Sequence, residues 1–366
     1  MMRWLLLLLP LAIALEHFMP GRPLLVFGVA AAGIVPLAAF MAQATGSLAT
    51  RLGPALGGLL NATFGNAAEL IIALAALRSG LHEMVKASIA GTIIGNILLV
   101  LGIAMVAGGA RHGEQRYDAR NARMQATMLT LAVISLIMPA AYEAIVPNSG
   151  PALDSISAWI AIALLLVYAA SIAFTVAQSR AAKARRSNGG NGGNGDDHED
   201  AGGHGHHGPQ WSVGKATVVL AAVSIGIIWL SEILVGTVEP ASQELGLSDA
   251  FTGVFVLAVV GGAAEQATAI VAARQNRMDL AMSIALGSGV QLALMVAPLL
   301  VLLSYVIGPH PMGLVFGPGL VLSILFAVLI TGQVASDGRT DWLRGVQLIA
   351  VYLILGAVFF YVPDVS

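Results

Sequence analysis

The stretch GNAAELIIALAALRSG at residues 65–80 has a counterpart in GGAAEQATAIVAARQN at residues 261–276. Shifting the sequence against itself by 196 positions superimposes the two stretches, so that Glu69 coincides with Glu265. The arginines nine residues after these glutamates coincide as well, and matching glycine, leucine and valine positions continue for about 30 residues. A repeat of this kind predicts a chain built from two related halves.

The composition around both stretches is that of a membrane protein. Of the 366 residues, 57% are hydrophobic and only 10% are charged, whereas a soluble domain carries about 25% charged residues. The mean hydropathy is +0.83. This excludes most soluble enzymes and also nucleic-acid binding, which needs a basic surface. The absence of cysteine excludes disulfides and thiolate metal sites.

Eleven apolar segments are long enough to be spanning helices. Their uninterrupted hydrophobicity, without two-residue alternation, favours helices over the strands of a barrel. The segments lie near residues 3–19, 23–45, 54–78, 84–110, 122–146, 153–178, 214–236, 248–274, 278–307, 311–333 and 343–362.

The distribution of basic residues predicts the orientation. With the N-terminus in the cytoplasm, fifteen of the eighteen Lys and Arg residues fall on the cytoplasmic side, which is the asymmetry of the positive-inside rule. The exceptions are Arg22, Arg78 and Lys86. An odd number of spans then places the C-terminus outside. No cleavable signal peptide is predicted, and we expect an integral protein of a bacterial inner (plasma) membrane.

The two glutamate motifs lie five spans apart, so they have opposite orientations in the membrane. Inverted repeats of this kind are typical of secondary transporters. We therefore predict an all-α polytopic membrane protein with about 11 transmembrane helices. An extra N-terminal helix (1–22) precedes two inverted-topology five-helix repeats, at residues 23–179 and 214–366.

A polar segment at residues 180–213 separates the predicted repeats. It contains basic residues, then NGGNGGNG, DDHED and HGHH, a composition that cannot bury a core. We predict a cytoplasmic Gly/Asn/His-rich linker. Its histidines are a possible site for zinc, nickel or copper, although the composition favours a solvated linker without a site. They are His198, His204, His206 and His207.

Glu69 and Glu265 lie well inside apolar segments. A charge near the bilayer centre costs at least ~2.5 kcal/mol, so such residues usually line a transport pathway. Polar residues recur at helical spacing near them, and their oxygens are ligands that hard cations such as calcium prefer. Any single hydroxyl among them is also explained by a bond to its own helix. The candidates are Asn66, Thr92, Asn96, Ser288 and Gln291.

Residues 65–102 and 261–302 resemble the two conserved repeats of the cation/proton exchanger (CAX) family of calcium antiporters, within the calcium/cation antiporter superfamily. Residues 231–253 resemble the family segment before the second repeat. The resemblance implies calcium/proton antiport by alternating access, with Glu69 and Glu265 as the central cation- and proton-binding carboxylates. It implies that Asn66, Asn96, Ser288 and Gln291 are the polar positions around them.

The second motif departs from the family pattern G-N-A-A-E-H, since Gly262 replaces the asparagine and Gln266 replaces the histidine. A sodium or potassium/proton antiporter, or an exchanger of manganese or another divalent cation, therefore stays an alternative. Two further acids, Glu232 and Glu239, are either peripheral cation relays or ordinary interfacial residues.

Other classes of function fit the sequence less well. A channel is disfavoured because paired buried acids in inverted repeats suit alternating access. The chain has no H-E-x-x-H and no G-x-S-x-G motif, so we predict no enzymatic activity. We expect no cofactor, and the predicted partners are calcium, protons and the lipid bilayer.

Overall fold

The computed structural model describes residues 4–146, 150–188 and 211–361. Within these ranges, eight helices are long and apolar enough to cross a membrane. They cover Pro23–Leu52, His82–His112, Ala119–Ile145, Ala152–Gln178, Val213–Leu245, Asp249–Arg274, Met278–Ser304 and Trp342–Phe360. Two shorter apolar helices, Leu8–Phe18 and Pro318–Val334, accompany them. The all-α membrane fold predicted from hydropathy is thereby confirmed.

In the first half of the chain, the described residues form seven α-helices, a 3-10 helix (η1), a π-helix (η2) and one short strand. They are η1 (Trp4–Leu7), α1 (Leu8–Phe18), α2 (Pro23–Phe64), α3 (Ala67–Arg78), α4 (His82–Ile94), η2 (Gly95–Val100), α5 (Leu101–His112), β1 (Gln115–Arg116), α6 (Ala119–Ile145) and α7 (Gly150–Asn188).

The second half has the same character, with two π-helical segments, η3 and η4. Its elements are α8 (Val213–Leu245), α9 (Asp249–Phe251), η3 (Thr252–Leu257), α10 (Ala258–Arg274), α11 (Met278–Gln291), η4 (Leu292–Val296), α12 (Ala297–Ser304), α13 (Pro318–Val334), β2 (Arg339–Thr340) and α14 (Trp342–Phe360).

The expected helix at residues 54–78 is not continuous. Helix α2 extends to Phe64, and a new helix, α3, begins at Ala67. Within α2 the chain also turns sharply, because a Cβ on Gly57 would lie 2.3 Å from the carbonyl oxygen of Ala49. Eight residues of straight helix would separate these positions by about 12 Å. Helix α2 therefore includes the predicted span at 23–45 and the first part of the next one.

The expected helix at 311–333 begins later, at Pro318. Residues 305–317, which we call the strap, have no regular structure. Pro309 and Pro311 lack the backbone N–H groups that a helix needs, which explains the late start. The strap is fixed instead by tertiary hydrogen bonds, for example from the Leu314 backbone N–H to Ser157 Oγ at 2.9 Å.

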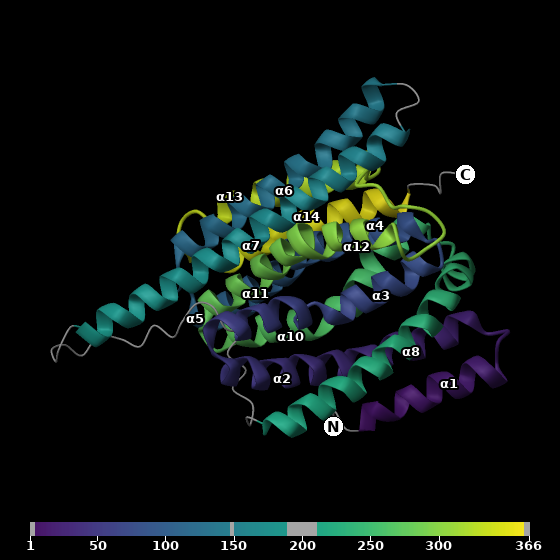
Figure 1. The fold of residues 1–366 in the computed structure, drawn as a ribbon, viewed down its shortest axis with the longest axis horizontal. Helices are drawn as coiled ribbons and strands as arrows, with labels where there is room; N and C mark the ends of the chain where they lie inside the picture. The colour runs from purple at the N-terminus through teal and green to yellow at the C-terminus, as the bar shows by residue number, and fades with distance from the viewer. Residues whose placement is uncertain (1–3, 147–149, 189–210, 362–366) are drawn as a thin grey trace.

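The helices lie side by side in two groups (Figure 1). Helices α1, α2 and α8 share one apolar core, whereas α4, α5, α6, α11, α12 and α13 contribute to a larger one. Helices α3 and α10 contact both groups: α3 packs on α8 and α4, and α10 packs on α2, α5 and α11. The two motif helices are thus enclosed between the two cores.

Loops gather in two sets. Strand β1 pairs antiparallel with β2, and Gln115 Nε2 donates to the Ala273 carbonyl oxygen at 3.0 Å, so the ends of α5, α10 and α13 meet. The strap instead contacts the start of α7, where the Tyr305 hydroxyl donates to the Asp154 carbonyl at 3.0 Å. The positive-inside rule predicts that these two loop sets lie on opposite membrane faces.

Candidate functional site

The break between α2 and α3 places Asn66 in the protein interior, against α11. Asn66 is the residue before α3, and it is completely buried. Its Nδ2 donates to Gln291 Oε1 at 2.5 Å, and its Oδ1 accepts from Ser288 Oγ at 3.1 Å. Because Gln291 and Ser288 both lie on α11, the amide joins the start of α3 to the second half of the chain.

Ser288 extends this network to the π-helix η2. Asn96 Nδ2 donates to Ser288 Oγ at 3.1 Å, and both residues are buried. Four of the five polar candidates predicted from the sequence, Asn66, Asn96, Ser288 and Gln291, therefore form one hydrogen-bonded network. We call it the amide network.

The two predicted carboxylates meet beside the amide network. Glu69 lies in the first turn of α3 and Glu265 in α10. Their carboxyl groups interact electrostatically, and Ser288 of the amide network lies against Glu265. Gly261 permits this approach, since a Cβ there would lie only 3.1 Å from Glu69 Cγ. The structure thus brings together the two glutamates that the sequence repeat aligns.

Two oxygens at this place have no hydrogen-bond donor among the described residues. They are Glu265 Oε2 and Asn96 Oδ1, and both are buried. Burying an acceptor without a partner is costly, so such atoms call for an explanation. A cation would satisfy both. The available donors are carboxylate, amide and hydroxyl oxygens, the set that hard cations prefer over nitrogen or sulfur ligands.

Thr92 does not join the amide network through its hydroxyl proton. Thr92 Oγ1 donates to the Ser88 carbonyl oxygen of its own helix at 2.9 Å, although the residue is buried. The hydroxyl keeps its lone pairs for another partner. No group of three or more His, Cys, Asp or Glu side chains arranged to hold a metal occurs in the described part of the chain. The predicted linker histidines lie outside the described residues: His198, His204, His206 and His207.

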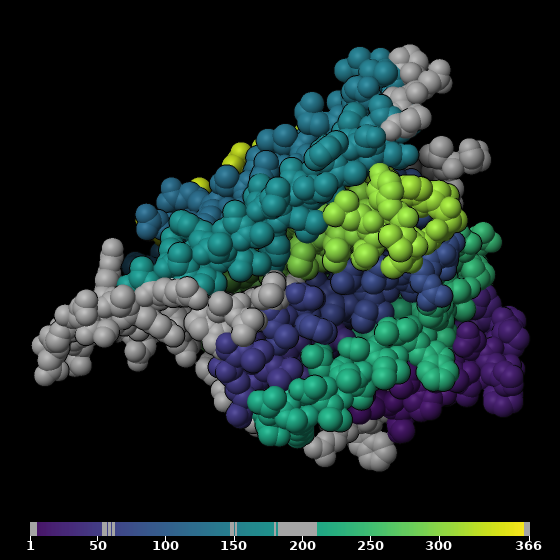
Figure 2. Space-filling model, in the orientation of Figure 1, coloured from purple at the N-terminus to yellow at the C-terminus, as the bar shows by residue number. Residues whose placement is uncertain are grey.

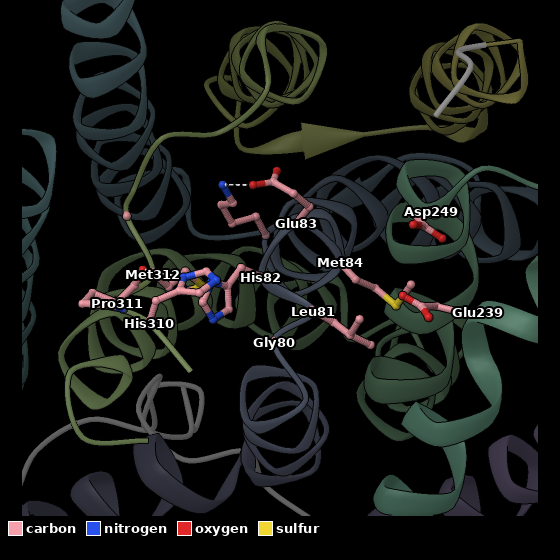
Figure 3. A pocket seen from close by; sticks show the side chains of 12 residues that line it. Gly80, Leu81, His82, Glu83, Met84, Glu239, Asp249, His310, Pro311 and Met312 are labelled. Carbon is pink, nitrogen blue, oxygen red and sulfur yellow. Dashed lines mark hydrogen bonds and ion pairs between the residues drawn. The ribbon is translucent and has the colours of Figure 1, made fainter. Parts of the chain in front are cut away.

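The two peripheral acids lie away from the amide network. Glu232 forms an exposed ion pair with Arg78, with 2.9 Å between Oε1 and Nη1. Glu239 lines a cavity of about 410 Å³ together with Glu83 and Asp249 (Figure 3). The cavity lies where the start of α4, the end of α8 and the strap meet, and Figure 2 shows the yellow-green strap region on the surface between α7 and the blue α3–α4 region.

Sequence reasoning missed two amide side chains near the site. Gln125 on α6 has a buried Oε1 without a donor among the described residues, and a Cβ on Gly287 would lie 3.6 Å from it. Gln266 on α10 covers Gly262, where a Cβ would lie 2.8 Å from Gln266 Nε2. The only signal for Gln266 was its departure from the family motif, and Gln125 gave none.

Known proteins match this chain over nearly its whole length. The family model described as "Sodium/calcium exchanger protein" matches residues 22–177 and 215–361. A "Ca(2+)/H(+) antiporter" of Aphanothece halophytica is 40% identical over 99% of this chain and 96% of its own length. "Ca(2+)/H(+) antiporter ChaA" of Bacillus subtilis is 37% identical over 91% of each chain.

Solved structures agree with these matches. The structure titled "Structure of native YfkE" superimposes with a TM-score of 0.81 at 33% identity, covering 99% of this chain and 100% of that one. The crystal structure of the H+/Ca2+ exchanger CAX, at 14% identity and a TM-score of 0.70, shares the fold over 98% of this chain and 91% of that one. The resemblance predicted from the two motifs is confirmed, and this chain belongs to the sodium/calcium exchanger protein family.

Proposed function

We propose that this protein exchanges calcium for protons across a membrane by alternating access. The observation that carries the proposal is the meeting of Glu69 and Glu265, from opposite halves of the chain, beside two buried oxygens without donors among the described residues. The names of the relatives, Ca(2+)/H(+) antiporters, support calcium and protons over the monovalent and manganese alternatives.

The chemistry follows from the charge of the pair. Two close carboxylates repel each other, and burial disfavours both charged forms. One divalent cation or two protons neutralise the pair equally well. The empty, doubly ionised site is costly to enclose, so the protein changes its open side only when the site is occupied. Obligatory exchange results without a separate lock.

The amide network supplies the neutral ligands in this proposal. Calcium takes six to eight oxygens, which exceeds what two carboxylates provide. Asn66, Asn96, Ser288 and Gln291 present amide and hydroxyl oxygens, and Thr92 presents its hydroxyl lone pairs. They bind the cation without adding charge, so two carboxylates still balance one divalent ion.

The residues around the site support a route for cation entry and an orientation of the protein in the membrane. Lys86 and Glu83 in the lining of the cavity near the strap form an ion pair, so Glu239 and Asp249 give this cavity a net negative charge that concentrates cations. Glu232, held by Arg78, is a second peripheral acid of this kind. We place the cavity outside, with the N-terminus in the cytoplasm and the C-terminus outside a bacterial inner membrane.

The proposed architecture is an extra helix (1–22), a five-helix repeat (23–179), a cytoplasmic linker (180–213) and an inverted five-helix repeat (214–366). The π-helical segments support it, because η2 starts at Gly95 and η4 at Leu292. These positions coincide within one residue under the offset of 196. We further propose that the protein needs no cofactor and catalyses no covalent reaction.

Flux in proteoliposomes tests the proposal. Purified protein is reconstituted with an outward or inward proton gradient, and a pH dye reports proton movement on addition of calcium, manganese, sodium or potassium. We expect calcium to drive the largest proton flux in the opposite direction. Flux driven by sodium or potassium alone, or a steady current without exchange, would contradict calcium/proton antiport.

A further inference from the structure

The two repeats carry an amide at different positions in their motif helices. In the first repeat the amide is Asn66, and Leu70 follows four residues later. At the equivalent positions of the second repeat the amide comes second: Gly262 has no side chain, and Gln266 follows four residues later. Each repeat thus has one carboxamide within a turn of its glutamate, displaced by four residues between them.

The geometry brings the two carboxamides to comparable places. A helical side chain leans toward the N-terminus of its helix, so residue 266 covers position 262. A Cβ on Gly262 would lie 2.8 Å from Gln266 Nε2 and 3.5 Å from its Cδ. The Gln266 carboxamide therefore occupies the space that an asparagine side chain at position 262 would fill.

The same space borders the buried oxygens of the site. A Cβ on Gly262 would lie 3.7 Å from Asn96 Oδ1, which has no donor among the described residues. Glu265, with the second such oxygen, directly precedes Gln266 in the chain. The side chain of Gln266 thus lies beside Asn96 Oδ1, at the edge of the amide network that faces the second repeat.

We propose that Gln266 is a further cation-coordinating residue, which supplies from the second repeat the neutral amide oxygen that Asn66 supplies from the first. The amide nitrogen and oxygen exchange places by a half-turn of the terminal torsion, so the oxygen reaches the position of Nε2 without other movement. A neutral ligand raises the coordination number without altering the balance between two carboxylates and one divalent ion. The proposal rests on the proposed function, because it names a ligand of the same site.

The competing explanation is that Gln266 merely fills space. Gln266→Met separates the two, because methionine keeps the length and volume but lacks the amide oxygen. We expect Gln266→Met to raise the KM for calcium, and the Kd measured by calorimetry on the detergent-purified protein, by about tenfold. The exchange rate at saturating calcium stays within threefold. Leu70→Met, at the equivalent position of the first repeat, is the matched control and keeps both constants.

A rescue completes the test. Gln266→Leu loses calcium affinity in the same way, whereas the double variant Gly262→Asn with Gln266→Leu restores it, because it returns a carboxamide to the space beside Asn96 that Gln266 fills. The glycine tolerates this change, since apart from the Gln266 amide the nearest atom to a new Cβ is 3.7 Å away.

Two results would overturn the inference: unchanged calcium KM and Kd in Gln266→Met, or a double variant that binds no better than Gln266→Leu. Both require a wild-type protein that exchanges calcium for protons. A wild type that shows no such exchange contradicts the proposed function itself, so the two failures are distinguishable.

Discussion

The two motifs carry a glutamate at equivalent positions, Glu69 and Glu265, but the backbone and the contacts around it differ. In the first, the helix is interrupted before Ala67, and Asn66 forms hydrogen bonds to Gln291 and Ser288. In the second, α10 continues through Gly261 and Gly262 without a break. The first half is fixed by directional hydrogen bonds, and the second by close packing of a smooth helix surface against Glu69.

The difference extends to the helices that follow. Under the offset of 196, Ser288 corresponds to Thr92 and Gln291 to Gly95. Ser288 connects Asn66 with Asn96, whereas Thr92 bonds to its own helix and Gly95 has no side chain to offer. The two motif regions that the sequence repeat aligns are therefore chemically unequal: Asn66 is held in the amide network, whereas the space beside Gly262 is filled by Gln266 of the same helix.

The largest effect on transport is expected at Glu69 and Glu265, where the two halves carry the same residue. Glu69→Gln and Glu265→Gln should each abolish cation-dependent proton flux, because one remaining carboxylate cannot neutralise a divalent ion or exchange two protons. The pH-dye assay in proteoliposomes measures this. Wild-type flux in either variant would show that the pair does not carry transport.

A smaller but still large effect is expected when the first motif is converted to the second. Asn66→Gly leaves Gln291 and Ser288 without their buried partner, which costs about 1–3 kcal/mol of stability. Calcium exchange should fall at least tenfold. The change at the equivalent position, Gly262→Ala, displaces the flexible end of Gln266. It should raise the calcium KM, as Gln266→Met does, but lower exchange at saturating calcium less than threefold. Equal losses would mean that the two halves are equivalent after all.

Ser288 and Thr92 extend the comparison to α11 and α4, the helices that follow the two motif helices. Ser288→Ala removes the hydroxyl between Asn66 and Asn96 and should lower the free energy of unfolding by about 1–3 kcal/mol. The calcium KM should rise with it. Thr92→Ala removes a hydroxyl whose proton is used within its own helix and should cost less than about 1 kcal/mol. Thermal unfolding in detergent and calcium titration measure both losses. A larger loss of stability in Thr92→Ala than in Ser288→Ala would contradict the prediction.

The smallest effect is expected at the periphery. Glu232→Gln removes the exposed ion pair with Arg78, which is worth at most about 1 kcal/mol. Unfolding temperature and calcium exchange at saturating calcium should stay close to wild type. A loss as great as that of Glu69→Gln would assign Glu232 to the central site rather than to the surroundings.

Hydropathy and repetition in the sequence predict a large part of the fold and the centre of the site. The apolar segments identify the helices, since lipid leaves few other structures for the backbone, and the repeat pairs Glu69 with Glu265 at equivalent positions. The break before Ala67 was missed because Gly65 and Asn66 interrupt an apolar run too briefly to lower its hydropathy. Tertiary hydrogen bonds stabilise that break, and they leave no periodic signal in a sequence.

The strap and the amide of Gln266 were missed for related reasons. Residues 311–317 are apolar enough to continue a predicted span, but Pro311 and the contacts with α7 keep them irregular. The position of Gln266 over Gly262 depends on the space that a missing side chain leaves, which becomes visible only in three dimensions.

The π-helical segments η2 and η4 determine where the chain tolerates a change in length. A π-helical turn holds one residue more than an α-helical turn. A single-residue deletion inside η2 would therefore convert it to α-helix and leave α5 facing its present neighbours. The same deletion inside α5 would rotate all following side chains of that helix by about 100°. The fold therefore tolerates the loss of one residue within η2 or η4. Such a deletion also removes the local widening of the helix beside Asn96 or Gln291.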